Sequence, residues 1–384
     1  MTQMTGYAEL ALLPEGLHDD LAPFAGHEAR SVAQLVAQFE GHGYQQVKPP
    51  LIEFEESLLA GPGAGVARHM FRLMDPISQR MMGLRADMTT QVARIAATRL
   101  KDAPRPLRLC YAGQVLRVRG SQLRPERQYA QAGVELIGAE SVAGDAEVVL
   151  LAAEVLQDLG VQGLSVDLTV PSLVPLLTQA LGLKGAEGEA ARQALDERDG
   201  AAIEALAPGV RQQLGAVMRA AGPADRAIKA LADLDLPDTA RALCDYLAEL
   251  IACLKKDNGG LTLTVDPGES RGFEYQTGMS FSLFAEGVRG ELGRGGRYPL
   301  ANGESAIGFT LYLDSLMRAI PDQKAPRRLY LPFGTLGERA RQLRAEGWVT
   351  IQCLDDKVDP AAEAKTLGCD HILRDDQAVA VVLS

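Results

Sequence analysis

The chain has 384 residues, more than one typical domain holds, so two or three domains are expected. It carries 39 basic and 50 acidic side chains, a net charge of -11, which counts mildly against a nucleic-acid partner because such proteins present basic faces to phosphates. Apolar residues make up 47% of the composition but form no run long enough to span a bilayer, so no membrane partner is expected.

Cysteine and histidine usage predicts a cytoplasmic protein without a metal centre. The five cysteines are scattered with no C-x-x-C pair, which favours a reducing compartment over a disulfide framework. The five histidines show no metal-ligand spacing, so we expect neither a metal nor a cofactor. No basic segment precedes an apolar run at the start, so no secretory signal is expected.

The first part of the chain predicts helices interleaved with antiparallel strands. In residues 27–41, Val32, Leu35 and Phe39 recur at helical spacing. The run 43–54 carries Pro49-Pro50, which favours a bulged or edge strand. Further along we expect a hairpin over 70–84, a helix over 86–100, strands over 106–118 and 128–138, a helix over 144–159 and a strand over 164–170.

The second part changes character at residue 172. Residues 172–257 are rich in Ala and Leu and predict a helical insertion. Strands are expected again over 261–266 and 275–285, followed by a Gly-rich turn over 290–298 and a helix after Gly308. From Pro326 a strand–helix alternation predicts a small parallel-sheet module.

These elements predict an α+β fold, with an antiparallel sheet flanked by helices and interrupted in sequence by the insertion. The expected domains are a core domain formed by 1–171 and 258–322, the helical insertion 172–257, and a C-terminal α/β domain 326–384.

Residues 116–138 carry the strongest chemical signal. Arg117 lies on the first predicted strand, and Gln131 and Glu135 share one face of the second because strand side chains alternate. An arginine holds a carboxylate in two parallel bonds and a glutamate holds an ammonium, so the set suits a free amino acid. From residue types alone, the more common alternative is a ladder of charges on a solvated sheet face.

This segment resembles motif 2 of class II aminoacyl-tRNA synthetases, specifically of histidyl-tRNA synthetase. Other blocks resemble the same family in the same order: LPEGLHD (13–19), GYQQVKPPLIE (43–53, similar to the dimer-forming motif 1), LRADMT (84–89), RGFEYQTG (271–278) and GGRY (295–298). The resemblance implies a class II synthetase-like fold over most of the chain.

Carried over by position, the resemblance implies a histidine pocket made by Asp87, Thr89, Arg117, Gln131, Glu135, Arg271 and Tyr275. Asp87 and Glu135 would meet the ligand ammonium and a ring N–H, and Arg117 or Arg271 would meet its carboxylate. Asp87 stands where synthetases have Glu, and Gln276 stands where the family has a second Tyr.

The departures from the family predict binding without catalysis, with no catalytic residue. Arg119 replaces the motif 2 Glu, and Tyr312-Leu313-Asp314-Ser315 stands where motif 3 has Gly-Leu-Glu-Arg. Ser315 has no cation for a triphosphate, and losing one charge-stabilising donor costs about 10²–10³ in rate. The tail 326–384 is shorter than a synthetase anticodon module, and its 8 basic and 9 acidic residues offer no basic surface to RNA.

Lost motif 3 and a reduced tail are typical of one synthetase-like family, the regulatory subunits of short-form ATP phosphoribosyltransferase, which opens histidine biosynthesis. The resemblance implies a homodimer that assembles with catalytic subunits into a hetero-octamer. It also implies that this chain activates the catalytic subunit and transmits its feedback inhibition by L-histidine. Two alternatives stay open: a working histidyl-tRNA synthetase, and a stand-alone ATP-dependent amino-acid ligase. Both alternatives need a nucleotide site, so nucleotide binding by the isolated chain distinguishes them from the regulatory-subunit hypothesis.

Overall fold

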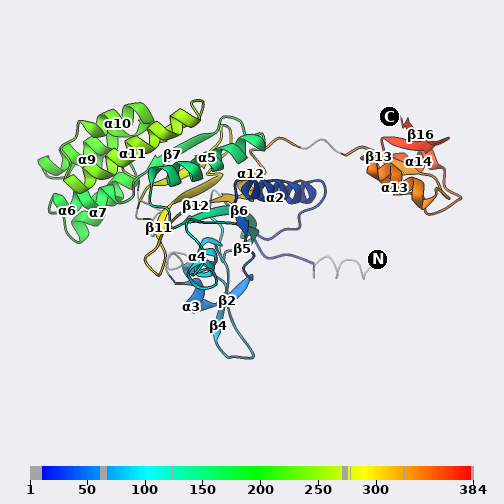
Figure 1. Ribbon diagram of the computed structural model, residues 1–384, viewed down its shortest axis with the longest axis horizontal. Coiled ribbons are helices and arrows are strands. Elements are labelled where there is room, and N and C mark those ends of the chain that lie inside the picture. Colours follow the sequence, from blue (N-terminus) through cyan, green and yellow to red (C-terminus); the bar gives the residue numbers. More distant parts are fainter. Residues whose placement is uncertain are drawn as a thin grey trace. The chain divides into compact units, whose positions relative to one another are not determined.

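The chain divides into two compact units, Met1–Pro321 and Asp322–Ser384 (Figure 1). The computed structural model describes residues 11–60, 67–122, 124–269, 276, 278–322 and 326–381. The helical segment 172–257 belongs to the larger unit. Its status as a domain of its own stays a prediction.

The larger unit is built on a sheet that has nine strands in the described part of the chain. In spatial order they are β1 (Gln45–Gln46), β5 (Leu107–Leu116), β6 (Gln128–Ile137), β12 (Ser305–Tyr312), β11 (Gly293–Pro299), β10 (Ser280–Phe284), β7 (Ser165–Thr169), β9 (Thr262–Val265) and β8 (Gly222–Pro223). The β1–β5 and β7–β9 pairs are parallel and the other neighbours are antiparallel. The predicted α+β class is confirmed.

Helices cover both faces of β5 and β6 (Figure 1). They are α2 (Phe24–Gly41) and α5 (Val142–Asp158) on one side and α4 (Thr89–Thr98) on the other. Even-numbered strand residues such as Val134 belong to the same buried cluster as Leu35 of α2. Odd-numbered residues such as Tyr111 pack in a second cluster with Val92 of α4. Strand alternation therefore separates two differently covered faces.

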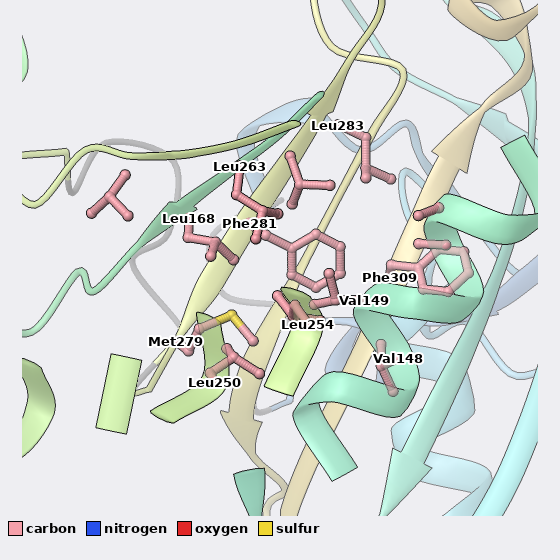
Figure 2. Close-up of a cluster of buried hydrophobic side chains, with 14 of the residues drawn as sticks. Val148, Val149, Leu168, Leu250, Leu254, Leu263, Met279, Phe281, Leu283 and Phe309 are labelled. Carbon is pink, nitrogen blue, oxygen red and sulfur yellow. The ribbon is translucent and has the colours of Figure 1, made fainter. Parts of the chain in front are cut away.

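The helical segment shares its core with the sheet. Its helices are α6 (Leu173–Ala180), α7 (Ala186–Asp196), α8 (Gly200–Glu204), α9 (Pro208–Ala220), α10 (Ala224–Ala232) and α11 (Asp238–Asp257). Figure 2 shows Leu254 of α11 and Val149 of α5 beside the Phe281 ring of β10. All three side chains are fully buried, and each contributes about 1.5–3 kcal/mol by leaving water.

Two predictions for the segment after residue 290 are wrong. The expected Gly-rich turn is β11, a strand inside the large sheet, and the expected helix after Gly308 is the second half of β12. Only the short α12 (Leu313–Leu316) follows it. Glycine usually weakens strands, but a Cβ on Gly295 would collide with the Gly308 carbonyl and the Phe281 ring. These glycines are required because the neighbouring strands approach closely. Local sequence propensity does not reveal that approach.

The run 43–54 forms two strands rather than one. β1 lies at an edge of the large sheet, as predicted, whereas β2 (Ile52–Phe54) belongs to a separate three-stranded sheet. That sheet also contains the predicted hairpin, β3 (Arg72–Met74) and β4 (Met81–Leu84), and α3 (Glu55–Leu58) follows β2. The prolines between β1 and β2 have no N–H for a ladder, and their carbonyls instead accept hydrogen bonds from Arg85 and Gln91.

The smaller unit has the predicted alternation of strands and helices. Its elements are β13 (Arg328–Leu331), α13 (Gly337–Ala345), β14 (Val349–Gln352), α14 (Pro360–Thr366), β15 (His371–Arg374) and β16 (Gln377–Ala380). Their order is β14-β13-β15-β16, with β13 parallel to both neighbours and β16 antiparallel to β15. Among the described helices of the whole chain, none combines the length and apolar character needed to cross a bilayer.

Candidate ligand pocket

Asp87, just before α4, and Gln131, on β6, are joined directly. The Gln131 amide Nε2 donates to Asp87 Oδ2 at 3.2 Å, and its Oε1 accepts from the Met88 backbone N–H at 3.3 Å. The other Asp87 oxygen accepts from the Thr89 N–H at 2.9 Å. The start of α4 and the middle of β6 therefore hold the Asp87 carboxylate in one orientation.

Glu135 lies farther along β6 and is only 1% exposed. Tyr298 donates to its Oε2 at 2.8 Å, and the Tyr111 hydroxyl donates to Oε1 at 3.5 Å. Burial, with a further contribution from the Asp87 charge, raises the pKa of Glu135 to about 8 despite these donors. These surroundings therefore favour the protonated form of the Glu135 carboxyl at neutral pH.

Hydroxyl groups connect Glu135 to Thr89, whose backbone N–H in turn binds Asp87. Tyr111 shares a hydrogen bond of 2.7 Å with Thr310 Oγ1 and one of 3.3 Å with Thr89 Oγ1. Such a network can donate or accept at each position, so it adapts when a neighbouring carboxyl gains or loses its proton. Thr89, which the sequence placed in the site, thus lies between Asp87 and Glu135.

Glycines form the floor of the pocket because no side chain fits there. A Cβ on Gly308 would overlap the Glu135 carboxylate, and one on Gly133 would overlap the Tyr111 ring. Gly295 and Gly296 line the same space. Gly308 therefore leaves room for the buried carboxyl, and the glycines of the GGRY block add no side chain to the space beside it.

The free space among these groups is about 30 Å³, enough for one or two water molecules. A whole amino acid enters only if the walls move apart. The Gln276 side chain is one wall, is 7% exposed, and accepts a hydrogen bond from Ser280 Oγ. Arg271 and Tyr275, which the sequence also predicts for this site, lie outside the described residues.

Arg117 lies beside the pocket rather than in its described lining. It follows the last residue of β5, and its backbone N–H continues the ladder to the Arg127 carbonyl at 2.7 Å. Its Nε donates to the Ala86 carbonyl at 3.4 Å, and its guanidinium is 5.6 Å from the centre of the Tyr129 ring. The structure therefore brings Asp87, Thr89, Gln131 and Glu135 together and places Arg117 against the segment that carries Asp87.

Several residues of the pocket were missed at the sequence level. Tyr298, Tyr111 and Thr310 bind Glu135 or one another, yet they lie on three different strands. The only available signal was that Tyr298 ends the GGRY block. Among the described residues no three His, Cys, Asp or Glu side chains gather as a metal site would need.

Tyr312 closes the pocket on the side of α12. The Arg124 guanidinium lies 3.7 Å from the centre of its ring, and Tyr129 meets the ring edge to face at 6.2 Å between centres. Arg124 also approaches Asp314, with 3.2 Å between Nε and Oδ2. Ser315 is 2% exposed and accepts from Arg318 at 3.2 Å. The segment 312–315 is thus packed against the chain's own cations.

Comparison with known proteins gives the class first. Residues 16–316 match the family model described as histidyl-tRNA synthetase. A structure of histidyl-tRNA synthetase from Nostoc sp. PCC 7120 superposes with a TM-score of 0.78 at 18% identity, covering 95% of this chain and 91% of that one. The fold is that of a histidyl-tRNA synthetase-like protein of class II architecture.

Sequence relatives define the family within that class. ATP phosphoribosyltransferase regulatory subunits from Rhodospirillum centenum and Paramagnetospirillum magneticum are 56% and 54% identical, over 94% and 98% of this chain and 94% and 100% of theirs. A structure described as an ATP phosphoribosyltransferase regulatory subunit/histidyl-tRNA synthetase from Bacillus halodurans superposes with a TM-score of 0.80 at 23% identity, covering 92% of this chain and 96% of that one. The chain belongs to the family of ATP phosphoribosyltransferase regulatory subunits.

Proposed function

We propose that this protein binds histidine in the Asp87–Glu135 pocket and acts as the non-catalytic regulatory subunit of ATP phosphoribosyltransferase. It would activate a short catalytic subunit, the enzyme of the first step of histidine biosynthesis, and transmit feedback inhibition to it. One observation carries the proposal: the polar groups suited to an amino acid are ordered around Glu135, while Tyr312 and Arg124 pack together beside them.

The chemistry of the two acidic groups suits the two ends of histidine. Asp87, oriented by Gln131 and the Thr89 N–H, presents a carboxylate to the α-ammonium. Glu135 has a pKa of about 8, close enough to that of imidazole for the two groups to share a proton. Arg117, or Arg271 from outside the described residues, would receive the ligand carboxylate.

The proposed lack of catalysis rests on what replaces the nucleotide-binding groups of a synthetase. Ser315 supplies no cation for a triphosphate, and the Tyr312 ring, held by Arg124, fills the space at the end of β12. Without a preorganised cation, activation of an amino acid by ATP loses about 10²–10³ in rate. We therefore propose binding without adenylate formation.

Regulation requires that histidine bind one state of the assembly more tightly than another. Parting of the pocket walls on ligand entry would provide such a difference, because the walls come from β6, β11, β12 and the start of α4. We propose a cytoplasmic homodimer formed through the region of β1 and β2, assembled with catalytic subunits into a hetero-octamer, with no nucleic acid or membrane involved.

The test is reconstitution with a short catalytic subunit and measurement of phosphoribosyl transfer with and without histidine. The expected result is stimulation by this chain and inhibition of the stimulated rate by histidine. No stimulation would contradict the regulatory role, and stimulation insensitive to histidine would contradict the effector role. Histidine-dependent ATP–pyrophosphate exchange by the purified chain would instead favour a working synthetase, the class named by the matching family model.

A further inference from the structure

A second cavity, of about 280 Å³, lies among α2, α12 and the adjoining ends of β5 and β6. Gln114 of β5 and Gln128 of β6 line it, and their even numbers place them on the face covered by α2 and α5. Gln131 and Glu135 have odd numbers and point to the other face. Among the described residues the two cavities share no lining side chain.

The second cavity is strongly acidic. Asp20 precedes α2, Glu28 lies on α2, Glu126 precedes β6 and Asp314 lies on α12, so segments far apart in sequence bring four carboxyl groups to one hollow. The basic side chains that line it are His18, 3.2 Å from Asp20, and Arg318, 4.0 Å from Glu126. Arg124, which does not line the cavity, forms an ion pair with Asp314, with 3.2 Å between Nε and Oδ2.

Glu28 has no ion-pair partner among the described residues. Burial, followed by the charges of Asp20 and Asp314, raises the pKa of Glu28, while a hydrogen bond with Gln114 lowers it. Asp20, Glu126 and Asp314 each have a basic side chain within 4.0 Å. The repulsion that a bound cation would relieve is therefore the one between Glu28 and the carboxylates of Asp20 and Asp314.

Buried polar atoms around the cavity lack hydrogen-bond partners. The Asp314 side chain is 6% exposed, and its side-chain partner among the described residues is Arg124, whose Nε lies 3.2 Å from Oδ2 without the geometry of a hydrogen bond. In the described part of the chain, the Tyr129 hydroxyl and Glu126 Oε2 are buried and have no hydrogen-bond partner of good geometry. Buried polar groups in native proteins are rarely left so, and several of them around one hollow indicate a site that a ligand completes.

We propose that this cavity binds a small organic cation carrying an ammonium or guanidinium group. Such a group donates hydrogen bonds to several carboxylates at once. Phe24 and Tyr129 also line the cavity, and their rings attract a cation that lies over them. This inference does not depend on histidine binding in the other pocket.

The test is calorimetric titration of the full chain with agmatine, which carries both an ammonium and a guanidinium group. We expect one agmatine per chain, with binding weakened about tenfold or more in Glu28→Gln because a charge-assisted contact is lost. The matched control is Glu249→Gln, which removes the same charge from an exposed position of α11 and should bind as the wild type does.

Absence of binding to the wild-type chain would overturn the proposal. Equal affinity in wild type and Glu28→Gln would do so too, as would equal weakening in both variants, which would indicate general attraction to an acidic protein. Thermal melting of each variant without ligand checks that the fold is retained.

The cation could come from a free metabolite or from an arginine or lysine side chain of a bound protein. Agmatine titrated into the complex with the catalytic subunit separates these sources. Release of the subunit would identify a protein side chain as the occupant, whereas retention of the subunit with agmatine bound would identify a free cation.

Discussion

Glu135 shows at the scale of one residue how surroundings set chemistry. A glutamate on a strand face is ordinarily ionised at neutral pH, but here burial raises its pKa to about 8. Two tyrosines from other strands supply its hydrogen bonds. The residue type was evident in the sequence, and its protonation state was decided by packing.

Replacing Glu135 with Gln tests its role as the effector's partner. Gln keeps the size but cannot become an anion, so the histidine concentration for half inhibition should rise roughly tenfold or more. Inhibition curves of the reconstituted enzyme measure it, and size-exclusion chromatography should show assembly retained. The enzyme reconstituted with the control Glu249→Gln should be inhibited by histidine as with the wild type. An unchanged inhibition curve for Glu135→Gln would mean that the effector binds elsewhere.

The same carboxyl predicts a pH dependence of stability. Because its pKa is raised from 4.5 unfolded to about 8 folded, the folded state binds the extra proton between these values. Its contribution to the free energy of unfolding is therefore complete below pH about 4.5 and is lost as pH rises through about 8. Urea unfolding from pH 5 to 9 gives the free energy of unfolding of the wild type and of Glu135→Gln. The difference between the two should decline as the pH rises, and a pH-independent difference would contradict the prediction.

At the scale of elements, a buried ionic contact joins α5 to the sheet and to the helical segment. Asp145 of α5 has a fully buried side chain that accepts from Arg297 of β11 and, at 2.8 Å, from Tyr246 of α11. The helical segment is thus tied to the core through a polar network as well as through the cluster in Figure 2.

Asp145→Asn should therefore be strongly destabilising, by about 3–5 kcal/mol, because it leaves the Arg297 charge buried without an anion. Urea unfolding measures the loss. The control is Glu189→Gln, which removes an exposed pair with Arg192 and should cost less than about 1 kcal/mol. Similar losses in the two variants would show that the Asp145 contact is no stronger than a surface pair.

At the scale of the whole molecule, the proposed regulation would be a coupling between histidine and the substrates of the catalytic subunit. Thermodynamic linkage makes this coupling reciprocal. Phosphoribosyl pyrophosphate should therefore weaken the binding of histidine to the complex by a certain factor. Histidine should weaken the binding of phosphoribosyl pyrophosphate by the same factor. Calorimetric titration of the complex with each ligand, alone and with the other saturating, measures both factors, and unequal factors would rule out equilibrium competition between two states.

The sequence by itself determined the elements with strong periodicity and the residues that carry charge. Alternation in 128–138 and helical spacing in 27–41 identified β6 and α2, and the motif blocks pointed to Asp87, Thr89, Gln131 and Glu135, which lie together in the structure. That they bind histidine stays a prediction. These features are local, so neighbours along the chain are enough to reveal them.

Tertiary structure alone decided what depends on strands meeting from distant parts of the chain. The glycines of 293–296 indicated a turn by propensity, but contact with β10 and β12 makes that segment a strand of the sheet. Tyr111, Tyr298 and Thr310 surround Glu135 because three strands align in register. The raised pKa of Glu135 and the acidic cavity beneath α2 follow from burial, a property that no single segment possesses before the chain has folded.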